Sequence, residues 1–89
     1  MADAEIVQTG LAQAVARFPQ ARAALCRLAL TDPEFREICE EYALALTSLA
    51  SFEARPDADD RPEVGDYRTV ITEIETEIDR YLREAGRKH

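Results

Sequence analysis

The sequence predicts an all-α protein: an antiparallel helical hairpin packed by a broken N-terminal helix, forming a three- to four-helix bundle. Apolar residues recur at three- and four-residue steps along nearly the whole chain, and no run alternates as strands do. Two amphipathic stretches of similar length also flank a loop rich in proline and aspartate. Because 89 residues have room for one core, we expect a single helical domain over 1–89.

The N-terminal segment is expected to form two helices, 4–18 and 20–30, divided at Pro19. Gly10 weakens the first of them by about 1 kcal/mol relative to alanine. Pro19 lacks a backbone donor and its ring clashes with the carbonyl four residues earlier, so the helix either kinks or ends there. The apolar face of the first helix comprises Ile6, Val7, Leu11, Ala14, Val15 and Phe18.

The second segment is expected to be a helix over 33–53. Thr31 and Asp32 are both candidate N-caps, and Pro33 suits the first helical turn. If Thr31 is the cap, Glu34 completes a capping box. Its apolar seam steps by three and four residues through Phe35, Ile38, Tyr42, Ala45, Leu49 and Phe52.

An acidic loop over 54–65 is expected to lead into a last helix over 66–85, followed by a tail over 86–89. Gly86 stands where a helix C-cap belongs. The seam of the last helix comprises Tyr67, Ile71, Ile74, Ile78 and Tyr81. The two seams predict an antiparallel hairpin, and the N-terminal segment has the apolar stripe needed to complete its core. The alternative is a dimer in which two hairpins share a four-helix core.

Charge and hydropathy exclude several classes of partner. The net charge is −7 and no basic stripe is present, so we expect no nucleic-acid binding. No uncharged stretch is longer than the eleven residues of Ile6–Ala16, whereas a membrane span needs about twenty. The N-terminus does not resemble a secretory signal peptide, because Asp3 and Glu5 stand where such a peptide has basic and then apolar residues. We therefore expect a cytoplasmic location.

No catalytic, cofactor-binding or metal-binding residues are expected. Cys26 and Cys39 are thirteen residues apart and form no CxxC motif, and the only histidine is His89. No serine or cysteine therefore has a local histidine partner, and the isolated glycines make no phosphate-binding loop. The acidic loop does not match the EF-hand spacing, because Pro62 and Arg68 fall at its glycine and bidentate-acid positions. Whether this loop binds a cation stays open.

Aromatic residues provide the candidate interaction surface. The tyrosines lie on the two seams, where they are either core residues with the hydroxyl at the rim or the edge of a groove for a partner. The candidate residues are Tyr42, Tyr67, Tyr81, Phe18 and Phe52.

Residues 31–82 also carry a pattern of four pieces: DPEFREICEEY at 32–42, Leu49, Tyr67-Arg68, and EIETEI at 73–78. This pattern resembles short bacterial helical-hairpin proteins of unassigned function, of which the YdcH-like family is the best known. The resemblance implies a small cytoplasmic bacterial helical protein, and it implies no catalytic residues or substrate.

These observations favour a non-enzymatic protein-interaction or regulatory module that binds a protein partner. The alternative is a structural hairpin that assembles with itself, for example as a homodimer. An enzyme is the least favoured class, because a helical core of this size has little room for a deep pocket.

Overall fold

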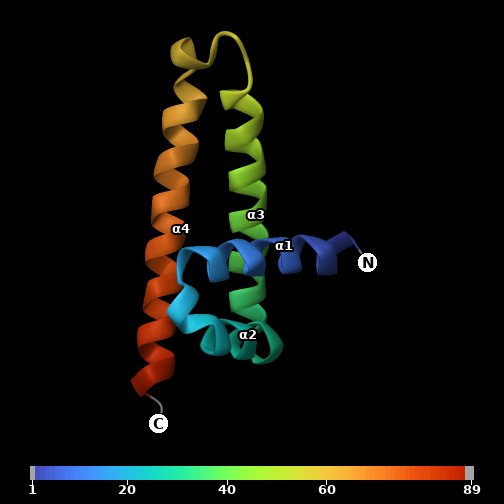
Figure 1. The fold of residues 1–89 in the computed structure, drawn as a ribbon, viewed down its shortest axis with the longest axis vertical. Helices are drawn as coiled ribbons and strands as arrows, with labels where there is room; N and C mark the ends of the chain where they lie inside the picture. The colour runs from blue at the N-terminus through green and yellow to red at the C-terminus, as the bar shows by residue number, and fades with distance from the viewer. Residues whose placement is uncertain (1, 88–89) are drawn as a thin grey trace.

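Four α-helices and two short 3₁₀ turns make up the computed structural model, which describes residues 2–87 (Figure 1). The elements are α1 (Ala2–Arg17), η1 (Pro19–Ala21), α2 (Arg22–Thr31), α3 (Pro33–Glu53), η2 (Ala58–Asp60) and α4 (Pro62–Arg87). No strand occurs within the described part of the chain. The predicted all-α helical bundle is therefore confirmed.

The long helices α3 and α4 run antiparallel with their apolar seams facing each other. Near the start of α3, the ring of Phe35 meets the ring of Tyr81 edge-on, with centroids 5.5 Å apart. Near the loop, Phe52 stacks on Tyr67 at 5.7 Å. Buried isoleucines of α4 fill the space between these two aromatic pairs. The fold is therefore built around the α3–α4 hairpin that the two seams predict.

Helix α1 lies across α3 and does not run alongside it (Figure 1). At the crossing, the backbone of Gly10 touches the backbone of Cys39, and a methyl group at Gly10 would overlap the Cys39 carbonyl. Ala14, one turn later, is fully buried. These small side chains let α1 approach α3 closely, so Gly10 serves packing at a cost in helix propensity.

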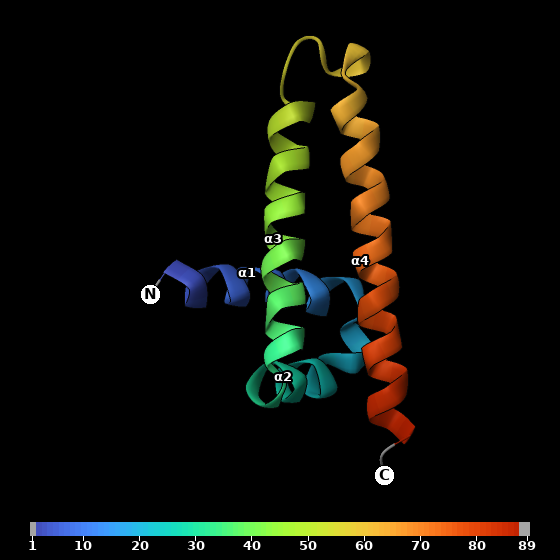
Figure 2. The ribbon, with the colours of Figure 1, turned by 180° about the vertical axis from the view of Figure 1, so that it is seen from behind.

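The hairpin has one covered face and one open face. Figure 2 shows α3 and α4 in front of α1, whose N-terminal half projects beyond α3 to the left. We call the side that carries α1 the covered face and the opposite side the open face.

Pro19 ends α1. The helix stops at Arg17, and Phe18 adopts φ −127° and ψ 67°, outside the helical region. The 3₁₀ turn that begins at Pro19 then redirects the chain into α2, which starts at Arg22. The predictions that Phe18 closes the first helix and that the second begins at residue 20 were wrong, because the residue before a proline disfavours helical angles.

Asp32 is the N-cap of α3, so the capping box with Thr31 does not form. The Asp32 carboxylate accepts hydrogen bonds from the backbone N–H groups of Glu34 (2.9 Å) and Phe35 (3.2 Å). The Thr31 hydroxyl instead donates to the Arg27 carbonyl within α2. Asp32 is also the only residue between the two helices, and its own N–H closes the last turn of α2 onto Leu28.

Helix α4 is longer than predicted at both ends. It begins at Pro62, four residues before the expected start at 66, because proline at the first helical position is already fixed near helical φ. It also continues through Gly86 to Arg87, and Gly86 does not adopt the positive φ of a C-cap. The expected tail over 86–89 therefore loses its first two residues to the helix, and Lys88 and His89 lie outside the described residues.

Candidate functional site

The five aromatic residues predicted as an interaction surface lie at separate places in the fold. Tyr42 is only 3% exposed and belongs to the core. The other four are half-buried: Phe52 and Tyr67 near the hairpin loop, Tyr81 against the start of α3, and Phe18 at the α1–η1 connection. The structure brings them together in pairs at most, so they form no common surface.

Tyr42 joins three helices through a polar cluster. Its hydroxyl donates to Glu75 Oε2 at 2.8 Å, and Glu75 Oε1 lies 3.6 Å from Arg17 Nε. Burial and the adjacent Glu75 carboxylate raise the pKa of Tyr42, so the hydroxyl stays protonated and remains a donor. This arrangement attaches α4 to α3 and to the end of α1, and we assign it a structural role.

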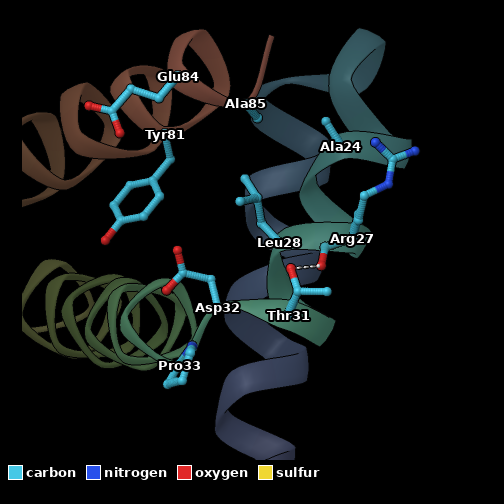
Figure 3. A pocket seen from close by; sticks show the side chains of 9 residues that line it. All are labelled: Ala24, Arg27, Leu28, Thr31, Asp32, Pro33, Tyr81, Glu84 and Ala85. Carbon is cyan, nitrogen blue, oxygen red and sulfur yellow. Dashed lines mark hydrogen bonds between the residues drawn. The ribbon is translucent and has the colours of Figure 1, made fainter. Parts of the chain in front are cut away.

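A hollow lies where α2, the α2–α3 junction and α4 meet (Figure 3). Leu28 and Tyr81 reach into it, and the Asp32 carboxylate faces the tyrosine hydroxyl. However, that carboxylate already caps α3, and the Thr31 hydroxyl is bonded to the Arg27 carbonyl. The Asp32 and Thr31 side chains therefore serve the helix ends, and nothing in this hollow is arranged as a nucleophile with its base.

The cysteines and the acidic loop do not converge on a reactive centre. Cys39 is fully buried, which raises the pKa of its thiol to about 11, so it is protonated at neutral pH and a poor nucleophile. In the loop, Arg61 lies 3.0 Å from Asp57 and 3.9 Å from Glu63. Within residues 2–87, no three His, Cys, Asp or Glu side chains are placed to hold a metal ion.

The most distinctive surface is a groove between α3 and α4 on the open face. Two of its apolar residues are unusually accessible, since Leu44 is 50% exposed and Val70 is 40% exposed. The buried side chain of Ile74 is the third apolar residue of the lining. Glutamates complete the lining, so the groove combines an apolar floor with acidic edges. We call it the open-face groove, lined by Glu41, Leu44, Val70, Glu73, Ile74 and Glu77.

The sequence contains one signal for this groove, and it lies outside the two seams. Leu44 falls between seam residues Tyr42 and Ala45, at a position that faces away from the partner helix in a heptad pattern. A large apolar residue outside the seam has no predicted neighbour. Val70 also lies outside the α4 seam, so the place of these two residues in one groove is visible only in three dimensions.

A second apolar area lies at the other end of the molecule. Leu30, at the end of α2, is 81% exposed, and it lines a hollow with the half-buried Val7 and Ala29. Unlike the open-face groove, this area has mixed charge, because Arg36 lies beside Glu37 and Glu40.

Comparison of the chain with protein-family models, curated proteins and solved structures found no significant match. None of the helices in the described part of the chain has the length and apolar character needed to cross a bilayer.

Proposed function

We propose that this protein is a non-enzymatic protein-interaction module and that the open-face groove is its binding surface. One observation carries the proposal: Leu44 and Val70, both large, apolar and exposed, line one groove together with Ile74. Grouped apolar side chains with a polar rim are typical of protein-binding surfaces, whereas single exposed apolar residues are not informative. A partner that covers them would gain the free energy of burying this apolar area.

The remaining chemistry of the described residues supports a binding role over a catalytic one. The most perturbed groups, Tyr42 and Cys39, are held in their neutral forms inside the core and line none of the hollows described above. A cytoplasmic location is part of the proposal, and the free thiols of Cys26 and Cys39 favour a reducing compartment. Membership of the YdcH-like hairpin proteins stays a prediction.

The second candidate function is a homo-oligomerising hairpin. The observation that favours it is Leu30, because an 81% exposed leucine beside Val7 provides an apolar contact away from the open-face groove. The mixed charges of Arg36, Glu37 and Glu40 there would allow a second copy to pair opposite charges across a two-fold axis.

Site-specific photocrosslinking in the cells that make the protein tests both candidates. A benzoylphenylalanine at position 44 places the reactive group in the open-face groove, and the same residue at the exposed position Thr76 of α4, outside the groove, is the matched control. The proposal expects an adduct with a different protein from position 44 and none from position 76. An adduct at twice the 10.0 kDa chain mass would favour the homo-oligomer, and no adduct from position 44 would contradict the proposal.

A further inference from the structure

Building on the proposed function, we infer that the partner presents a basic amphipathic α-helix, which lies along the open-face groove with lysine or arginine side chains on both sides of a short apolar stripe. The inference rests on the shape of the groove and on the sign of its charges. It also rests on the repulsion that those charges would exert on a second copy of this chain.

The shape of the groove selects a helix. Its walls are two helices of the same hairpin, so it exposes no strand edge that an extended peptide could join. Both helices contribute to its apolar floor, Leu44 from α3 and Val70 and Ile74 from α4. A third helix that lays its own apolar stripe between α3 and α4 would cover this floor by the ridge-and-groove packing that helices use with one another.

The charges of the groove select a basic partner. The lining includes three glutamates, one from α3 and two from α4, and neither lysine nor arginine. Glu77 is partly neutralised by Arg80, whose Nη2 lies 2.9 Å from its carboxylate. Glu41 and Glu73 take part in no ion pair among the described residues, and both are exposed. They flank the apolar floor, one on each helix. Charges at the rim of a binding surface steer and orient a partner of opposite charge.

The same charges disfavour a second copy of this chain in the groove. A two-fold contact through the open face would place Glu41 and Glu73 against the same residues of the other copy. Like charges facing each other in an interface lower affinity, and the chain as a whole carries a net charge of −7. The groove is therefore matched to a different, basic protein.

Two synthetic helical peptides of about 18 residues test the inference with the full chain. Both carry leucine at positions i, i+3, i+4 and i+7; one has lysines flanking this stripe and the other has glutamates. Fluorescence anisotropy measures affinity, and amide NMR shifts locate the binding site. We expect the lysine peptide alone to bind, with the largest shifts at Leu44 and Val70, and its affinity to fall as salt is raised.

A pair of charge-matched variants separates the groove from the overall charge. Glu41→Gln with Glu73→Gln removes two charges from the groove, and Asp59→Asn with Asp60→Asn removes two from η2, outside it. The first variant should weaken binding of the lysine peptide by up to about tenfold and the second by much less. Equal losses would show that only net charge matters and would overturn the inference.

Two further outcomes distinguish failure of this inference from failure of the proposed function. Equal binding of both peptides, or of neither, overturns the basic helix as the partner but leaves the crosslink from position 44 to decide whether the groove binds a protein. Mass spectrometry of that crosslink then identifies the captured segment. A segment that is acidic or non-helical overturns the inference while supporting the proposed function, and a segment from this same chain overturns both.

Discussion

The two faces of the α3–α4 hairpin differ in how their apolar residues are covered. On the covered face, Gly10 and Ala14 have side chains so small that α1 comes to rest with its backbone on α3. On the open face, Leu44 and Val70 stand beside carboxylates and remain accessible. Whether another helix of the chain covers a face of the hairpin therefore depends on small residues that allow close approach, as well as on the apolar residues of that face.

The largest expected effect comes from Phe35→Ala, at the end of the hairpin where α2 and α3 join. Phe35 is fully buried, so its removal should lower the free energy of unfolding by about 3–5 kcal/mol. Phe52 occupies the matching seam position near the loop but is only half-buried, and Phe52→Ala should cost less than half as much. Urea unfolding followed by circular dichroism measures both; equal losses would mean that the two ends of the hairpin are equally well packed.

Gly10→Ala tests the close approach on the covered face directly. The new methyl group would overlap the Cys39 carbonyl, so α1 must move away from α3, at a net cost of about 2 kcal/mol after the gain in helix propensity. Gly65→Ala is the control, because Gly65 also lies inside a helix but has nothing within 4 Å of the added carbon. The control should stabilise the protein by up to about 1 kcal/mol. If Gly10→Ala were also stabilising, the crossing of α1 over α3 would be wrong.

Cys39 makes the covered face sensitive to alkaline pH. Burial raises the pKa of its thiol from 9.0 to about 11, so the folded protein holds this proton more tightly than the unfolded chain does. The resulting stability is complete below pH 9 and is lost as the pH rises toward 11, with a loss of about 1 kcal/mol between pH 8 and pH 10.

Urea unfolding at pH 8 and pH 10 measures the slope of the free energy of unfolding against pH, which is the test of the Cys39 effect. Cys39→Ala should flatten it, and Cys26→Ala is the matched variant that removes a thiol from a less buried position. Tyr42 contributes to this slope in the same direction in the unsubstituted protein and in both variants, since its pKa is raised as well. An unchanged slope in Cys39→Ala would contradict the assignment to this thiol.

The smallest effect is expected on the open face. Leu44→Gln replaces an exposed leucine by a residue of similar helix propensity, and should change the free energy of unfolding by no more than about 0.5 kcal/mol. The same substitution should weaken any partner held in the open-face groove. A loss of stability near 2 kcal/mol that grows with protein concentration would instead mean that a second copy covers Leu44 in solution.

Much of this fold could be predicted from the sequence, because its signals are local. The seams of α3 and α4 are periodic, and Pro33 with a preceding aspartate identifies the start of α3. A proline also begins α4 at Pro62, but Arg61 and not an aspartate precedes it, and the surrounding acids and a second proline favoured a longer loop.

The crossing of α1 and the open-face groove could not be predicted, because both depend on contacts between distant residues. Gly10 has the same local effect whether or not Cys39 lies against it, so propensity alone indicates only a weakened helix. The seam position of Tyr42 predicts either a core residue with its hydroxyl at the rim or the edge of a partner groove, and only the position of Glu75 in α4 makes it a buried donor. That Leu44 and Val70 line the same groove follows only once the arrangement of the hairpin is known.

Asp32 has a consequence for how this chain tolerates change. It closes α2 through its own N–H and opens α3 through its carboxylate, with no spare residue on either side. An added residue at this joint would turn α2 by about a quarter of a revolution relative to α3, swinging Leu25 out of the interior. The length of this connection is thus constrained as tightly as its chemistry, and insertions are far better tolerated between Ala54 and Arg61.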